Sequence, residues 1–414
     1  MTLSIKSIQP FTAITKLTRE PLCQRRCIVS MKTAQPRSKR ERLVIDSEVC
    51  QTSRLGKRWK EYHGSKNWEG LLDPLDDGLR DEIMRYGSFI EAAYKCFDSG
   101  SPSTSYSNRH VMDSDEGGYR VTKDLHATSS IPMPSWIGVG ERSSWIGYVA
   151  VCEDQNEITR LGRRDIVISL RGTGTCFEWL ENMRATLTRC PFGNIKFPNG
   201  QHGTPMVESG VLSLYTSSTS ACQSLQQMVK DEILKIVERY GDEPLSVTIT
   251  GHSLGASLAI LAAYDIKNTI KHALHLSVIS FGGPRVGNQS FRHNLEQQGT
   301  KILRIVNSDD LITRVPGFFV EDNDDVAKEQ KPRVENFPRW IHKCVNDKRR
   351  VYANIGHELR LSSRASLKMN SIDVATCHDL KTYLHLVNGF VSSSCPFKAS
   401  ARMMLNKAST VPPT

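Results

Sequence analysis

The pentapeptide GHSLG at residues 251–255 constrains the fold more than any other part of the sequence. It follows the run LSVTIT (245–250), which is typical of a buried strand, and it precedes a stretch rich in small residues, 256–267, that favours a helix. A GxSxG sequence between a strand and a helix is the pattern of a nucleophile elbow, a strained turn that lifts the serine hydroxyl clear of the sheet. Its two glycines lack the Cβ atoms that would clash where strand and helix approach each other. The alternative is a tight glycine turn without catalytic function, which any α/β protein can contain.

The pattern around this unit predicts an α/β protein with a mostly parallel sheet, because predicted strands alternate with predicted helices. Further strands are expected at 145–151, 165–170, 276–281 and 302–306, and further helices at 71–98 and 225–240. Asp76 and Asp77 are suited to cap the helix at 71–98, and Gly241 has the place of the left-handed residue that ends the helix at 225–240.

Ser253, the central residue of the pentapeptide, needs a base to take its proton and an acid to orient that base. With this elbow the chain order is serine, then acid, then histidine. Asp309 and Asp310 follow the strand expected at 302–306, and such acids lie just beyond the carboxyl ends of strands, so both are candidates. The histidines further along are His342, His357, His378 and His385. The last two are favoured, because a histidine at the start of a helix reaches the top of the sheet.

Acyl transfer also needs two N–H groups that face the oxyanion. The residue after the nucleophile, Leu254, is expected to provide one of them. The other is expected from the loop RGTGT (171–175), which follows the strand predicted at 165–170 and is called the oxyanion loop below. In that loop Thr173 is expected to offer its hydroxyl as a donor in addition to its amide N–H. The alternative is an ordinary Gly/Thr turn, which has the same composition.

Most of the charge lies at one end of the chain. The net charge is +10, but residues 1–40 hold nine Lys/Arg and one acid, which leaves +2 for the rest. A nucleic-acid-binding protein needs a basic face on its folded part, so this distribution argues against one. A basic, Ser/Thr-rich, acid-poor start is typical of an organelle transit peptide, and Pro10, Pro21 and Pro36 favour a plastid over a mitochondrion. A disordered basic tail on a cytosolic protein is the alternative.

Two further classes of protein are disfavoured by the sequence. The longest apolar run, 256–264, is too short to span a bilayer, so no transmembrane segment is expected. The eleven cysteines are scattered, and neither a CxxC nor an HExxH motif occurs, so we expect free thiols in a reducing compartment and no metal site.

Several long blocks follow one another between about residues 55 and 390. They are WKEYHGSKNWEGLLDPLDDGLR (59–80), WIGYVAVCED (145–154), DIVISLRGTGTCFEWLENMRATLT (165–188), VTITGHSLGASLAILAAYDI (247–266), FGGPRVGN (281–288), RIVNSDDLITRVPG (304–317) and CHDLKTYLHLVNGF (377–390). In this order the blocks resemble the class 3 lipases, and more closely the plant class I phospholipases A1, acylhydrolases of the defective-in-anther-dehiscence type.

This resemblance implies an α/β-hydrolase fold, with helices on both faces of a mostly parallel central sheet. Residue by residue, it implies Ser253 as nucleophile, Asp310 as acid, His378 as base, and Thr173 and Leu254 as oxyanion donors. It implies no metal or organic cofactor. The family more often has RGTATC where this chain has RGTGTC, so Gly174 departs from the pattern next to a proposed donor.

The resemblance also implies a substrate, a glycerolipid cleaved at the sn-1 position at a membrane or lipid-droplet surface, with release of acids for jasmonate synthesis. A lid lies after the oxyanion loop in related lipases, so Phe177, Trp179 and Leu180 are expected either to touch lipid or to face the core. We divide the chain into a transit peptide (1–48), a lipase domain (49–395) and a tail (396–414). The head-group preference and the oligomeric state stay open.

Two other functions remain as alternatives. The first is a lipase-like signalling or binding protein without turnover, against which the presence of Ser253, Asp310 and His378 argues. The second is a general carboxylesterase, which would prefer short water-soluble esters over bilayer lipids.

Overall fold

The computed structural model describes residues 55–98, 118–128, 143–173, 186–193, 203–270, 274–316, 352–364 and 374–394. Contacts between Cα atoms divide the chain into residues 1–48 and 49–414, and every described residue belongs to the second unit.

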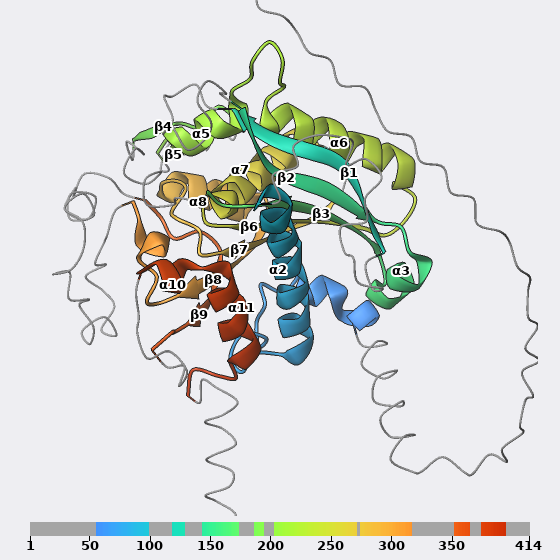
Figure 1. Cartoon of the computed structure of the whole chain (residues 1–414), viewed down its shortest axis with the longest axis vertical. Helices are drawn as coiled ribbons and strands as arrows, with labels where there is room; N and C mark the ends of the chain where they lie inside the picture. The colour runs from blue at the N-terminus through green and yellow to red at the C-terminus, as the bar shows by residue number, and fades with distance from the viewer. Residues whose placement is uncertain are drawn as a thin grey trace, which may run out of the picture. The chain divides into compact units, whose positions relative to one another are not determined.

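The described residues build a seven-stranded sheet in the order β1-β2-β3-β6-β7-β8-β9 (Figure 1). These strands are Tyr119–Thr128, Ser143–Cys152, Arg164–Leu170, Leu245–His252, His275–Phe281, Lys301–Asn307 and His357–Leu361. From β3 to β9 neighbouring strands are parallel, whereas β1–β2 and β2–β3 are antiparallel pairs. A separate antiparallel pair is formed by β4 (Leu187–Arg189) and β5 (Met206–Glu208). The predicted α/β architecture with a mostly parallel sheet is thereby confirmed.

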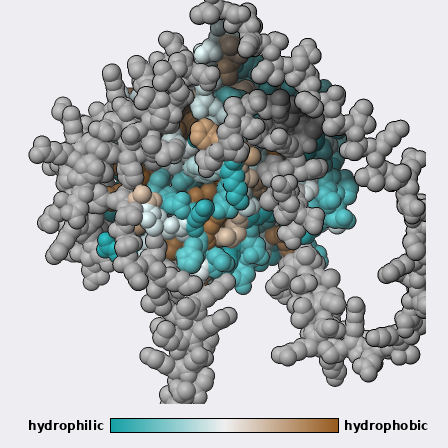
Figure 2. Space-filling view, in the orientation of Figure 1, coloured by the Kyte–Doolittle hydropathy of each residue, from teal (hydrophilic) through white to brown (hydrophobic). Residues whose placement is uncertain are grey.

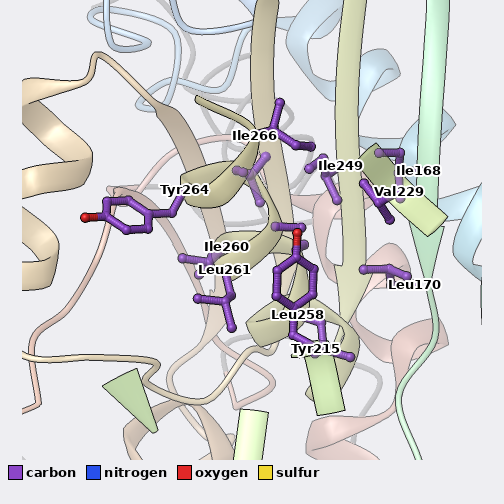
Figure 3. Close-up of a cluster of buried hydrophobic side chains, with 14 of the residues drawn as sticks. Ile168, Leu170, Tyr215, Val229, Ile249, Leu258, Ile260, Leu261, Tyr264 and Ile266 are labelled. Carbon is purple, nitrogen blue, oxygen red and sulfur yellow. The ribbon is translucent and has the colours of Figure 1, made fainter. Parts of the chain in front are cut away.

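Helices pack on both faces of the sheet, as expected. One face carries α5 (Ser209–Thr216), α6 (Leu225–Tyr240), α7 (Leu254–Thr269) and α8 (Gln289–Gln297), and the other carries α2 (Asp77–Asp98), α11 (Leu380–Gly389) and a helix at 55–62. Successive strand residues point to opposite faces: Ile166 and Ile168 join the first core, and Val167 joins the second. In the first core, side chains of α7 such as Leu258 gather with Tyr215 of α5 (Figure 3).

The remaining helical segments are short. They are α3 (Gln155–Leu161), the 3₁₀ turn η3 (Leu311–Arg314) and α10 (Val374–His378). The last two flank the site described below.

The described surface over α2 and α11 mixes hydrophilic and hydrophobic residues in the view of Figure 2. Among the described residues, the exposed large hydrophobic side chains are Phe97 and Leu234. No helix in the described ranges combines the length and the apolar character that crossing a bilayer requires.

Three details of the predicted elements are wrong. The helix expected at 71–98 begins only at Asp77, because Leu72 and Leu75 form a bridge and Asp76 accepts the N–H of Leu79 as a cap. Gly241 has φ −63°, so it ends α6 in the right-handed and not the left-handed region. The third, the place of His378 relative to its helix, is described with the site. The helix at 225–240 is confirmed to the residue.

A buried charge cluster fixes α2 to the sheet near the start of β3. Arg85 pairs with Asp165 at 2.9 Å, and Arg163 pairs with Glu82 at 3.0 Å. The Arg163 guanidinium also donates to Nε2 of His63 (2.7 Å), and burial, followed by the charge of Arg163, lowers the pKa of His63. Two cations balance two anions around a neutral histidine, so the cluster stays buried without an uncompensated charge.

Candidate active site

The serine of the pentapeptide occupies a strained turn between β6 and α7. Ser253 has φ 57° and ψ −124°, a left-handed conformation that side chains rarely adopt. A Cβ on Gly251 would collide with the backbone of Gly255, and a Cβ on Gly255 would collide with the carbonyl of Leu170 in β3. Both glycines are therefore required for the close approach of strand and helix, and the expected elbow is present.

Ser253 lies at one end of a hydrogen-bonded chain of three side chains. Nε2 of His378 is 2.9 Å from Oγ of Ser253, and Nδ1 of His378 is 2.7 Å from Oδ2 of Asp310. All three side chains are buried. Because a carboxylate only accepts, Nδ1 of His378 carries the proton, and Nε2 of the neutral ring is left to accept the serine proton.

The two partners of Ser253 come from separate segments beyond the sheet. Asp310 lies three residues after the end of β8 and caps η3. His378 is the last residue of α10, and α11 begins only at Leu380. The expectation that His378 opens a helix is thus wrong, since Asp379 caps α11 by accepting the N–H of Lys381.

The carboxylate of Asp310 is held by two further donors. Its Oδ1 accepts the N–H of Ile312 at 2.9 Å, and its Oδ2 accepts the hydroxyl of Tyr383 at 2.7 Å. The Tyr383 oxygen in turn accepts the N–H of Asn307. The sequence pattern does not distinguish Tyr383 as a site residue, because an aromatic residue in an amphipathic helix has the same pattern as an ordinary core residue.

The other candidates lie elsewhere. Asp309 forms an ion pair with Arg364 at 3.0 Å and does not contact His378. His385 is exposed on α11, and His357 is exposed on β9. His342 lies outside the described residues. Among the described candidates, the structure brings together Ser253, Asp310 and His378.

The loop after β3 lies beside the serine. The N–H of Gly172 donates to the Tyr94 hydroxyl at 2.8 Å, and the carbonyl of Gly172 accepts from Arg171 at 2.7 Å. The next residue, Thr173, has a buried Oγ1 with no hydrogen-bond partner among the described residues. Leu254 is the first residue of α7, so its N–H has no acceptor within the helix. Phe177, Trp179 and Leu180, together with Gly174, lie outside the described residues.

A second buried histidine, His252, lies next to the serine. Its Nε2 is 2.7 Å from the carbonyl oxygen of His378, and its Nδ1 is 2.8 Å from the Tyr94 hydroxyl. Burial, followed by the charge of His378, lowers the pKa of His252 from 6.5 to about 3. His252 therefore stays neutral over the whole range in which an esterase works.

Mild acid is expected to lower the free energy of unfolding, because His252 and His63 are buried in the neutral form. Below pH 6.5 the unfolded chain binds a proton at His252 that the folded chain refuses until about pH 3, so stability is full above pH 6.5 and falls below it. Between pH 7.5 and pH 5 this histidine alone removes about 2 kcal/mol from the free energy of unfolding. The lowered pKa of His63 acts in the same direction. Urea denaturation at the two pH values measures the loss, and equal stability at both would contradict it.

The fold and this arrangement define a class, the serine ester hydrolases of the α/β-hydrolase fold. Comparison with known proteins narrows the class. The family described as lipase (class 3) matches residues 167–320, which include Ser253 and Asp310. The chain belongs to the plant phospholipases A1 within this lipase family.

The relatives support that assignment over most of the chain. Phospholipase A(1) DAD1, chloroplastic, of Arabidopsis thaliana is 57% identical over 86% of this chain and 81% of its own length. Galactolipase DONGLE, chloroplastic, of the same plant is 36% identical over 81% of this chain and 70% of its own. Among solved structures, the lipase from Rhizopus microsporus var. chinensis is 22% identical and matches with a TM-score of 0.41, covering 59% of this chain and 71% of that one.

These findings confirm four of the sequence-based predictions: the family, the fold class, the lipid ester hydrolase activity and the plastid location. The expected transit peptide, 1–48, whose first 40 residues carry the plastid prediction, lies outside the described residues, and so does the tail 396–414.

Proposed function

We propose that the chain hydrolyses the sn-1 ester of plastid glycerolipids through an acyl-enzyme on Ser253. The observation that carries the proposal is the hydrogen-bonded chain from Ser253 through His378 to Asp310. As Oγ of Ser253 attacks the ester carbonyl carbon, its proton passes to Nε2 of His378. Asp310 keeps the imidazole in the required tautomer and stabilises the imidazolium that forms.

The remaining steps return every group to its starting state. The bond from the carbonyl carbon to the glyceryl oxygen breaks, and that oxygen takes the proton from His378. A water molecule then attacks the acyl-enzyme and gives its proton to His378, which passes it to Oγ of Ser253 as the fatty acid leaves. In both steps we assign the stabilisation of the oxyanion to the amides of Thr173 and Leu254.

Replacement of Thr173 by valine tests whether the hydroxyl of Thr173 is a further oxyanion donor beside the two amides. The two side chains have nearly the same shape, so the variant removes a donor whose oxygen is buried without a partner among the described residues. Loss of an oxyanion donor typically costs about 100- to 1,000-fold in kcat. Since the Thr173 amide remains, we expect a loss toward the lower end, about 100-fold, with KM nearly unchanged. Steady-state kinetics on a soluble ester measures it, and an unchanged kcat would restrict the role of Thr173 to its amide.

The substrate class rests on the relatives. Proteins named phospholipase A1 and galactolipase are both similar to this chain over most of its length, and their substrates share a diacylglycerol body with different head groups. We therefore propose a glycerolipid at a membrane or lipid-droplet surface as the substrate. Phe177, Trp179 and Leu180 are proposed to contact its acyl chain, and 49–395 is proposed as the catalytic domain between a leader and a tail. Supply of acids for jasmonate synthesis stays a prediction.

The test is a substrate panel that reports position as well as rate. Phosphatidylcholine, monogalactosyldiacylglycerol and triacylglycerol, each with different acyl chains at sn-1 and sn-2, are presented in vesicles or emulsions beside a short soluble ester. We expect release of the sn-1 acid from at least one diacyl lipid, and its loss in Ser253→Ala. A clear preference for the short ester would favour a general carboxylesterase, and inactivity on all four would favour a scaffold without turnover.

A further inference from the structure

Four groups from distant parts of the chain form one hydrogen-bonded series beside the candidate active site. The N–H of Gly172 donates to Oη of Tyr94 (2.8 Å), Oη of Tyr94 is 2.8 Å from Nδ1 of His252, and Nε2 of His252 is 2.7 Å from the carbonyl oxygen of His378. The series runs from the loop after β3, through α2 and the end of β6, to the end of α10. It therefore connects the oxyanion loop to the histidine proposed as base.

The direction of each hydrogen bond follows from chemistry. A carbonyl oxygen can only accept, so Nε2 of His252 carries a proton. The ring is neutral, since its pKa is lowered to about 3, so Nδ1 is an acceptor and the Tyr94 hydroxyl donates to it. The Tyr94 oxygen is then available to accept the N–H of Gly172. A protonated His252 would lose the acceptor at Nδ1, and its charge would lie beside the His378 ring, whose centroid is 4.9 Å away.

The peptide that follows Gly172 carries one of the proposed oxyanion donors. Its carbonyl, that of Gly172, accepts from the Arg171 guanidinium, which is itself anchored on the carbonyl of Trp145 at 2.7 Å. In a planar trans peptide the N–H points opposite to the carbonyl, so this contact sets the direction of the Thr173 N–H. Tyr94 holds Gly172 from the other side. A Cβ at Gly172 would be 2.8 Å from Cβ of Ser253, so the loop has little freedom to shift.

We propose that Tyr94 and His252 are positioning residues, which fix the oxyanion loop relative to the backbone of His378. The oxyanion donors and the base can then act on the same substrate carbonyl. The proposal rests on the proposed function, because it assigns these residues to the same acyl transfer. The hydrogen bonds of this series end on the N–H of Gly172 and the carbonyl oxygen of His378, and not on Oγ of Ser253 or the imidazole nitrogens of His378. Because these residues preorganise the site, their replacement is expected to lower kcat and to leave substrate binding nearly unchanged.

Tyr94→Phe is the sharpest variant, because it removes one oxygen and keeps the ring. Tyr148→Phe is its matched control: the buried hydroxyl of Tyr148 donates to the carbonyl of Phe89 at 2.7 Å, away from the series. We expect Tyr94→Phe to lower kcat on a soluble ester by about 10- to 100-fold, with KM within about twofold and thermal stability close to that of the control. Tyr148→Phe should keep kcat near the wild-type value.

His252→Gln tests whether the two residues act through one series. Glutamine keeps an amide donor near the position of Nε2 and loses the acceptor at Nδ1, so it breaks the same contact as Tyr94→Phe. We therefore expect the double variant to lose little more kcat than the worse single variant. Losses that multiply, or equal kcat in Tyr94→Phe and Tyr148→Phe, overturn the positioning proposal alone. Absence of esterase activity in the wild type, or its survival in Ser253→Ala, overturns the proposed function and this proposal with it.

Discussion

Replacement of Ser253 by alanine is expected to abolish turnover while leaving the fold intact. The substitution removes only Oγ, which is the proposed nucleophile and lies 2.9 Å from Nε2 of His378. Alanine has the same Cβ as serine, so it meets the same strain at φ 57° and does not disturb the elbow. Removal of the nucleophile of such a triad costs about 10⁶-fold in kcat. Activity on a soluble ester, with thermal unfolding as the check of folding, measures the loss.

Ser257→Ala is the matched control for this variant. Ser257 is one turn further along α7, is equally buried, and donates to the carbonyl of Pro284 at 3.3 Å. We expect it to keep nearly full activity, since alanine suits a helix and only one long hydrogen bond is lost. Substantial activity in Ser253→Ala would move the nucleophile elsewhere, and equal loss in both variants would point to damage to α7 instead.

Replacement of Asp310 by asparagine has the second-largest expected effect. Asparagine can still accept the N–H of Ile312, but its amide would face Nδ1 of His378 with a donor. His378 would then turn to the tautomer with the proton on Nε2, which cannot accept the proton of Ser253. The corresponding change in a serine protease lowers kcat by about 10⁴-fold with its geometry intact. We expect a loss of about 1,000- to 10,000-fold here.

Asp309→Asn separates this effect from a general loss of charge. Asp309 precedes Asp310 in the chain but pairs with Arg364 and accepts the hydroxyl of Ser362. Kinetics of the two variants side by side should give a kcat for Asp309→Asn within a few-fold of the wild type. Equal losses, or the larger loss in Asp309→Asn, would contradict the assignment of Asp310 as the orienting acid.

The parts of the fold that local pattern encodes could be predicted from the sequence. The short runs rich in apolar and β-branched residues at β3, β6, β7 and β8 are typical of buried parallel strands. The apolar stripe of α6 predicts the bounds of that helix to the residue. The strained turn at Ser253 is formed within the GHSLG segment itself, so the sequence alone predicts the elbow.

The missed elements carry weaker local signals. Examples are β1, with its partly exposed positions, and β9, which has five residues and lies at the edge of the sheet. Helix α10 also has only five residues, too few for a periodic pattern, so the place of His378 at its end was not readable from spacing.

The partners of the serine depend on contacts between segments far apart in the chain. Spacing in the sequence makes Asp309 and Asp310 equally good candidates for the orienting acid, and only the resemblance to a known family favours Asp310. Their different environments, an ion pair with the exposed side chain of Arg364 and a buried hydrogen bond to His378, arise when β8, β9 and α10 come together. Tyr383 and Tyr94 are harder still, because a tyrosine whose hydroxyl serves the site has the same sequence pattern as one that fills the core.

The central claim is that His378 and Asp310 make Ser253 a nucleophile, and covalent labelling tests it most directly. The folded wild-type protein is treated with a fluorophosphonate, digested, and mapped by mass spectrometry. We predict one adduct, on Oγ of Ser253, that forms rapidly in the wild type and in Asp309→Asn and is lost or greatly slowed in Asp310→Asn. An unmodified Ser253 in protein that cleaves esters, or an adduct on another residue, would contradict the account.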